Sequence, residues 1–162
     1  MIEKLTGTRE TVFHPENLQV RLHINVEYED YPMHWHTDTE IIMPIENIYT
    51  VIIDKEKYIL NPGDIMIIPS GEIHQLFAPP TGKRYILQCD SALLGGLHGI
   101  DSISSDFYPC VYIQSVTGLA YHKQLSNILH QVAEEYLTHP PLYEASIASL
   151  LTSFFVIVGR NC

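Results

Sequence analysis

The feature that most constrains the fold of this chain is a succession of short segments with β-strand patterning, each ended by turn residues. In residues 20–26, apolar and polar side chains alternate with a period of two, which predicts a half-buried strand. Similar runs follow at residues 40–45, 49–54, 58–60, 65–68, 73–77 and 84–88. Gly, Pro, Asn and Asp separate them. Many short strands joined by turns predict a β-sandwich or a β-barrel.

The periodicity changes after residue 117. In residues 119–137, apolar side chains recur at three- and four-residue spacing, which predicts an amphipathic helix. We expect Pro141 in the first turn of a second helix, which runs to about residue 158 with Gly159 as its C-terminal cap. Apolar residues nearly encircle the end of this helix, so we expect both its own chain and a second copy to cover it.

Weaker patterns lie between the strands and the helices. Residues 91–105 are rich in Gly and Ser and read as a connector, with a short helical turn expected at residues 93–97. Residues 107–114 predict one more strand.

Length and charge exclude several classes of protein. The 162 residues fit one domain, and the formal net charge of −10 repels a phosphate backbone, so we do not expect this segment to bind DNA itself. Cys89, Cys110 and Cys162 lack CxxC spacing and predict neither a disulfide framework nor a zinc ribbon. The chain begins without a signal-peptide pattern, and no apolar run is long enough to span a bilayer. We therefore expect a soluble, cytoplasmic protein.

Four side chains have the chemistry of metal ligands. His34, His36 and Glu40 are even-numbered, so they share one face if their segment is extended, while Trp35 points the other way. His74 opens the strand that follows a Pro/Gly turn. Three imidazole nitrogens and one carboxylate oxygen suit Zn, Ni, Fe or Mn with coordination positions left open. The sequence thus predicts that these four residues meet in one cavity.

These residues resemble the paired motifs of the cupin superfamily. The first motif runs from a glycine through HxH to a glutamate and a glycine, and the second runs from glycine through proline and glycine to a histidine. Further matches are Gly63, Pro69 and Gly71. The departures are Tyr28 and Asn47 in place of glycines and Ala78 in place of an asparagine. Asn47 is a mild departure, because asparagine tolerates a positive φ. The resemblance implies a jelly-roll barrel, the double-stranded β-helix of cupins, near residues 20–90.

The whole chain is similar to the N-terminal effector-binding half of AraC-type transcription regulators. The segments that carry this resemblance are residues 32–36 with Glu40, residues 60–64 and residues 67–69. It implies a cupin-like barrel over residues 1–117 that binds a small-molecule effector, such as a sugar or an organic acid. Two antiparallel helices in residues 118–162 would form a homodimer within the same compact unit. A C-terminal DNA-binding domain would be absent from this sequence.

Two alternatives remain for the four candidate ligands and for the function. The ligands hold a divalent metal, or they form a hydrogen-bonded polar cluster inherited from a metal-binding ancestor, in which Glu40 orients the imidazoles. The favoured function is a sensor without catalysis. The alternative is a small metal-dependent cupin enzyme of the dioxygenase or isomerase type.

Other polar and aromatic residues also have two interpretations. Arg84 either pairs with an anionic effector or is a solvated strand residue. Aromatic side chains could stack on an effector, although we favour core or rim positions for them. They are Trp35, Tyr28, Tyr31, Tyr49, Tyr58 and Tyr85. We expect Asp64 to bond turn backbone.

Overall fold

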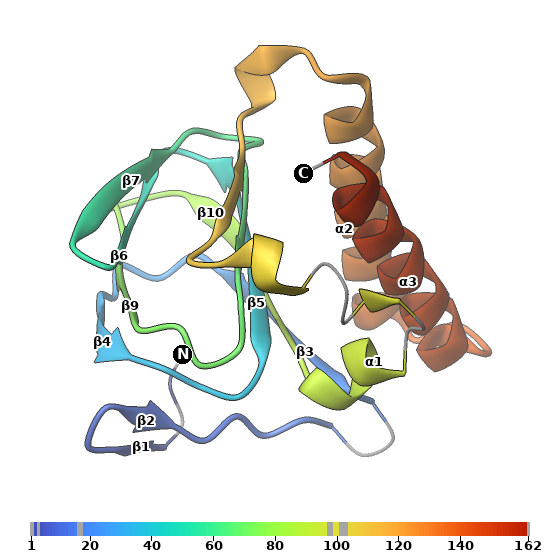
Figure 1. Ribbon diagram of the computed structural model, residues 1–162, viewed down its shortest axis with the longest axis horizontal. Helices are drawn as coiled ribbons and strands as arrows, with labels where there is room; N and C mark the ends of the chain where they lie inside the picture. The colour runs from blue at the N-terminus through green and yellow to red at the C-terminus, as the bar shows by residue number, and fades with distance from the viewer. Residues whose placement is uncertain (1, 3, 16–17, 97–98, 101–103, 162) are drawn as a thin grey trace.

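The computed structural model describes residues 2, 4–15, 18–96, 99–100 and 104–161. Within these ranges, two antiparallel sheets face each other as a jelly-roll barrel, and two long helices lie along one outer side (Figure 1). The predicted mostly β architecture, followed by two C-terminal helices, is confirmed.

The two sheets contain every predicted strand. The larger sheet has the order β11 (Val111–Ile113), β8 (Ile65–Ile68), β5 (Thr39–Glu46), β10 (Lys83–Cys89) and β3 (Val20–Asn25). The smaller sheet has the order β4 (Tyr31–His34), β9 (His74–Phe77), β6 (Tyr49–Ile53) and β7 (Glu56–Leu60). All neighbouring strands in both sheets are antiparallel.

The five-stranded sheet is buried on both faces, which explains its continuous apolar runs. On β5, Ile41 and Met43 belong to a core shared with the helices, whereas Ile42 belongs to the core inside the barrel. Successive side chains of a strand point to opposite faces, so a strand covered on both sides needs apolar residues at every position. All four residues of β8 are buried for the same reason. The molecule therefore has three layers: helices, five-stranded sheet and four-stranded sheet.

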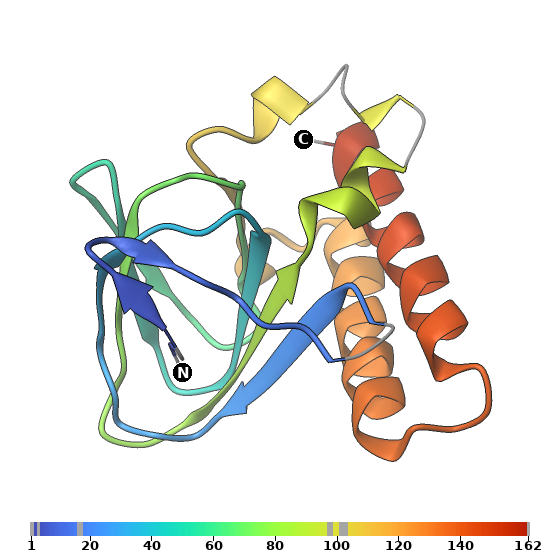
Figure 2. The same ribbon diagram turned by 90° about the horizontal axis from the view of Figure 1, so that it is seen from below.

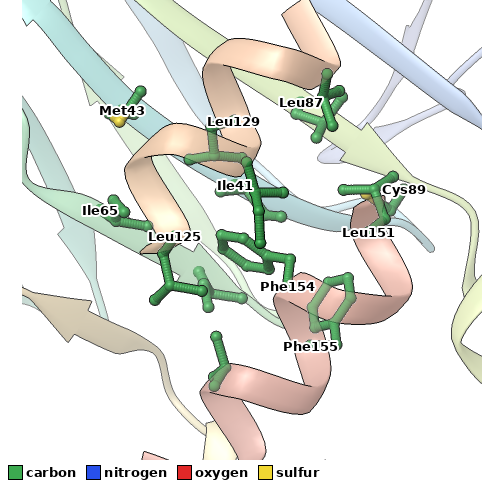
Figure 3. Close-up of a cluster of buried hydrophobic side chains, with 14 of the residues drawn as sticks. Ile41, Met43, Ile65, Leu87, Cys89, Leu125, Leu129, Leu151, Phe154 and Phe155 are labelled. Atoms are coloured by element: carbon green, nitrogen blue, oxygen red, sulfur yellow. The ribbon is translucent and has the colours of Figure 1, made fainter. Parts of the chain in front are cut away.

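Helices α2 (Ala120–Thr138) and α3 (Tyr143–Asn161) form an antiparallel hairpin on the outer face of this sheet (Figure 2). Figure 3 shows Phe154 and Phe155 of α3 packed with Leu125 of α2 among apolar side chains of the sheet. The five buried apolar residues of α3 are Ile147, Leu151, Phe154, Phe155 and Val158. Its own chain thus covers most of the apolar surface of α3. Among the described residues, no helix is both long and apolar enough to cross a membrane.

The predicted bounds of the second helix were wrong. Gly159 lies inside α3, which continues to Asn161, and Pro141 precedes the helix instead of lying in its first turn. The turn before α3 uses left-handed backbone at His139 and Leu142, and the Tyr143 amide bonds to the Pro140 carbonyl. At the other end, Asn161 donates a side-chain hydrogen bond to the Ile157 carbonyl, which extends the helix beyond the glycine.

Two features of the N-terminal third were not predicted as strands. They are β4 and a small hairpin of β1 (Leu5–Thr6) and β2 (Arg9–Glu10) that lies across one end of the barrel (Figure 1). Two-residue strands leave no periodicity to detect. The strand predicted at residues 107–114 is only β11, because a 3-10 helix (Ser104–Phe107) and Pro109, which lacks an amide donor, precede it.

The turns and the connector agree with the sequence. Asn47 has a φ of 63°, as expected for a glycine substitute, and Asp64 accepts hydrogen bonds from the amides of Asn61 and Ser115, both at 2.8 Å. The expected turn near residue 93 is the short helix α1 (Ser91–Gly95). Residues 97–98 and 101–103 of the predicted connector lie outside the described residues, as does Cys162.

Candidate metal centre

The two sheets bring the four predicted ligands together inside the barrel. His34 ends β4 and lies opposite His74 of β9 in the register of the four-stranded sheet, and their rings are 4.2 Å apart. After His36 the chain bends at residues 37–38 and enters the five-stranded sheet, where Glu40 is the second residue of β5. Each of the four side chains is only 1% exposed. We call these four residues the His/Glu cluster.

The atoms of the His/Glu cluster have the spacing of ligands around one ion. Glu40 Oε2 lies 3.1 Å from His36 Nε2, and Glu40 Oε1 lies 3.7 Å from His74 Nε2. One ring nitrogen of each of the three histidines lies within 4.8 Å of the others. Two ligands bonded at about 2.1 Å to the same ion are roughly 3 to 3.5 Å apart. The cluster therefore fits a small divalent cation with little adjustment.

Backbone carbonyls fix the same tautomer in all three histidines. The Nδ1 atoms of His34, His36 and His74 lie 2.8, 3.0 and 2.9 Å from the carbonyl oxygens of Pro32, Asp38 and Glu72. A carbonyl only accepts hydrogen bonds, so each Nδ1 carries a proton, and each Nε2 presents a lone pair when its ring is neutral. The hydrogen bond from His36 Nε2 to Glu40 Oε2 forms only when the His36 ring is protonated, in the absence of a metal. Outer hydrogen bonds of this kind orient the histidine ligands of metal sites.

Two buried atoms of the cluster, His74 Nε2 and Glu40 Oε1, have no hydrogen-bond partner among the described residues. Orphaned polar atoms in a protein interior are costly, and a bound ion is one of the few arrangements that satisfies both a lone pair on nitrogen and a carboxylate oxygen. The donor set and these orphaned atoms together show that the cluster suits a metal.

Burial and the neighbouring charges set the protonation of the cluster. Burial alone would raise the pKa of Glu40, but the hydrogen bond with His36 and the three imidazoles outweigh it and lower that pKa to about 2. Burial lowers the pKa of His74 to about 4 and also lowers the pKa of His34. For His36 the hydrogen bond with Glu40 overcomes burial, so its pKa is raised. At neutral pH, Glu40 is ionised while His34 and His74 are neutral, as metal ligands must be.

We expect the metal-free protein to lose stability as the pH falls from about 6.5 towards 4. In this range the unfolded chain binds a proton at His74 that the folded chain does not, so protons favour unfolding. The pKa difference corresponds to about 3 kcal/mol. The raised pKa of His36 changes the stability mainly above pH 6.5 and so does not offset this loss. Urea unfolding at pH 7 and pH 4.5 measures this loss. His74→Asn should reduce the pH dependence; an unchanged dependence would contradict the assignment.

The structure adds two residues to the site that the sequence analysis missed. Gln88 lies directly opposite Glu40 in the register of β5 and β10, and its Nε2 donates to Glu40 Oε2 at 3.2 Å. Glu10 of β2 is 3% exposed, and its Oε2 lies 3.6 Å from His34 Nε2. A polar residue within the apolar run of residues 85–89 was a usable signal for Gln88. Nothing in the sequence around Glu10 marks a buried carboxylate.

Arg84 is buried inside the barrel, so its interpretation as a solvated strand residue was wrong. Its guanidinium group donates to Asn25 Oδ1 at 2.6 Å and to the Glu27 carbonyl, and it lies 4.7 Å from the centre of the Tyr49 ring. The inward face of β10 carries Arg84 beside Ile86 and Gln88, because β10 alternates like β5. Arg84 thus has partners within the protein.

Most of the aromatic residues have the core or rim positions that we favoured. Tyr31 and Tyr49 are buried inside the barrel, and Tyr85 packs towards the helices. Tyr28 is 68% exposed. Trp35 is half-buried, and the Arg9 guanidinium lies 5.5 Å from its ring centre.

Space inside the barrel is small. The cavity beside the His/Glu cluster, lined in part by Glu10, Glu40 and Gln88, has a volume of about 10 Å³. That volume holds about one water molecule. A second pocket, of about 430 Å³, is lined by Met33, Ile52 and residues 71–75, which include His74. A sugar or an organic acid therefore enters the barrel only if side chains or the N-terminal hairpin move.

The barrel matches a known protein family in sequence. Residues 21–84 match the family model of the cupin domain, and they contain all four residues of the His/Glu cluster. These residues are thus similar in sequence to a cupin domain. No curated protein matches the chain significantly in sequence.

Solved structures share the fold of this barrel together with its helices. Apo ToxT from Vibrio cholerae is 9% identical over 87% of this chain, with a TM-score of 0.56. The AraC-like transcriptional activator CuxR is 10% identical over 74% of this chain, with a TM-score of 0.53. The chain spans 55% of the ToxT chain and 42% of the CuxR chain. The predicted resemblance to AraC-like regulators is thus confirmed at the level of the fold.

Proposed function

We propose that this chain is the small-molecule-sensing and dimerisation module of an AraC-type transcription regulator. It senses an effector with oxygen-bearing groups, such as a sugar or an organic acid, through a divalent metal held by His34, His36, Glu40 and His74. The metal, when bound, supplies a Lewis-acidic anchor for an oxygen atom of the effector. The metal is Zn, Ni, Fe or Mn, the ions that suit such a donor set.

The observation that carries this proposal is the two-sided burial of β5. Glu40 and Ile42 face the cavity and the barrel core, while Ile41 and Met43 pack against the helices. A displacement of β5 by an effector therefore acts directly on the core that positions α2 and α3. An effector shifts the arrangement of the helices only as far as its affinities for the two arrangements differ.

Two polar contacts also connect the barrel with α2. His122 Nε2 lies 2.7 Å from the Gly63 carbonyl oxygen, and His130 Nδ1 lies 3.2 Å from the Tyr85 hydroxyl. The first contact involves the turn before β8, and the second involves β10. These contacts support a model in which residues 1–117 sense the effector and residues 118–162 respond as part of the same compact unit.

We propose that the α2–α3 hairpin pairs two copies of the chain. Its outer surface carries Leu137 (62% exposed) and Val156 (41% exposed), with Leu150 and Ile157 half-buried. We expect a dimer of twice the 18.5 kDa chain mass in sedimentation equilibrium. Val156→Glu should weaken it at least tenfold by placing a charge in an apolar contact. Ile59→Glu, a matched change at an exposed residue of β7, should leave the dimer intact. A wild-type chain that stays monomeric at high concentration would contradict the dimer.

A thermal-shift screen of metal-loaded protein with sugars, organic acids and aromatic compounds tests the sensing role. A compound that binds the native state raises the apparent stability by mass action. Under the proposal, a compound that binds is recovered unchanged and alters the dimer equilibrium. Metal-dependent consumption of the compound would instead support the alternative of a small cupin enzyme.

A further inference from the structure

The N-terminal hairpin places a carboxylate beside the His/Glu cluster. Backbone hydrogen bonds of 2.9 Å join the Glu10 amide to the Trp35 carbonyl and the Trp35 amide to the Thr8 carbonyl. They attach β2 to the segment between His34 and His36. The side chain of Glu10 is consequently held in the barrel end that the hairpin covers (Figure 2), with 3% exposure.

Glu10 shares its surroundings with the ligands of the cluster. Its Oε2 lies 3.6 Å from His34 Nε2, close to the spacing of Glu40 from His36 and His74. The Gln88 amide lies between the two carboxylates, 3.4 Å from Glu10 Oε2 and 3.2 Å from Glu40 Oε2. Glu10 therefore approaches the same part of the cavity as Glu40, from the β1–β2 hairpin instead of from the five-stranded sheet.

The charge of the Glu10 carboxylate matters for the charge balance of the cavity. Three neutral imidazoles and two ionised carboxylates carry a charge of minus two in a buried site, and such charges are costly unless they are compensated. A divalent cation bound by three nitrogens and two carboxylates makes the site neutral.

We propose that Glu10 is a further metal ligand, and that the ion thereby holds the β1–β2 hairpin closed over the end of the barrel. This inference rests on the metal site of the proposed function. It assigns the hairpin as the movable cover of the cavity, because Glu10 of the hairpin and Ile2, which precedes it, line the cavity. The strands of the hairpin are only two residues long. An effector oxygen that replaced Glu10 at the ion would release the cover and open the cavity, while His34, His36, Glu40 and His74 kept the metal.

Zinc binding to the full chain tests the assignment through two readouts. Competition with a chromophoric chelator gives the affinity, and amide hydrogen exchange of residues 4–11 reports closure of the hairpin. Glu10→Gln removes the charge but keeps a side chain that can bond to Gln88. Glu56→Gln is the matched control, because Glu56 is exposed on β7. Glu10→Asp keeps the charge but shortens the reach, and so provides a second variant if Glu10→Gln folds poorly.

We expect zinc to bind Glu10→Gln at least about tenfold more weakly than the wild type and the control, with Glu10→Asp between them. Zinc should slow exchange of the hairpin amides in the wild type and in the control but not in Glu10→Gln. Equal affinities in all four proteins would overturn the role of Glu10 and leave the His/Glu cluster intact. A wild type that does not bind zinc would overturn both this inference and the proposed metal site.

Discussion

Replacing His74 with asparagine should weaken zinc binding about a hundredfold or more. His74 Nε2 is a buried lone pair without a hydrogen-bond partner, and its Nδ1 proton is already given to the Glu72 carbonyl. An asparagine side chain is too short to reach the same position. Changes to residues that only orient ligands already cost about 10- to 100-fold in metal affinity, so loss of a ligand should cost at least as much.

The effect on stability follows by linkage. Zinc at a hundred times its dissociation constant should stabilise the wild type by about 2.7 kcal/mol, whereas at the same concentration a variant with a hundredfold weaker affinity gains only about 0.4 kcal/mol. Denaturant unfolding with and without zinc measures the difference. His139→Asn is the matched control, because His139 is exposed and has a φ of 48°, which asparagine accommodates. An equal gain in His74→Asn and in the control would exclude His74 as a ligand.

Phe154→Ala should lower the free energy of unfolding of the whole chain by about 3 to 5 kcal/mol. The Phe154 side chain has no exposed surface and lies between the helices and the five-stranded sheet (Figure 3). Its ring also packs edge-on against Phe155, with ring centres 5.4 Å apart. The substitution therefore leaves a cavity in the core that joins residues 118–162 to the barrel.

The control for this prediction lies half a turn away on the same helix. Val156 is 41% exposed, so Val156→Ala should cost less than about 1 kcal/mol. Far-ultraviolet circular dichroism follows the helices, and Trp35 fluorescence follows the barrel. Both signals should change in one transition, shifted equally by Phe154→Ala. If the helical signal were lost first while the Trp35 signal stayed unchanged, the helices and the barrel would not share one cooperative core.

The strands and the four residues with the chemistry of metal ligands could be predicted, because short sequence patterns mark them. The alternation in residues 20–26 and the apolar run of β8 identify strands whatever their partners are. His34, His36 and Glu40 lie in one short segment, so their proximity requires only an extended backbone and one bend. His74 joins them because β9 pairs with β4 in a register that the sequence does not specify.

The features that sequence analysis missed depend on distant contacts. Glu10 enters the cavity because backbone hydrogen bonds join Thr8 and Glu10 to Trp35. A strand of two residues has no sequence pattern from which this pairing could be predicted. Gly159 looked like a helix terminus, but the packing of Val158 and the bond from Asn161 continue α3 past it. The internal role of Arg84 depends on Asn25, 59 positions away in the chain. In each case tertiary contacts overrode the local preference.

Elemental analysis of untagged protein, purified without added metal or chelator, tests the central claim most directly. The account predicts about one equivalent of a divalent transition metal per chain, which dialysis against a chelator removes and which His74→Asn lacks. Protein that contains no such metal, and that takes up none of Zn, Ni, Fe or Mn on incubation, would contradict it. The His/Glu cluster would then be a hydrogen-bonded group without a metal.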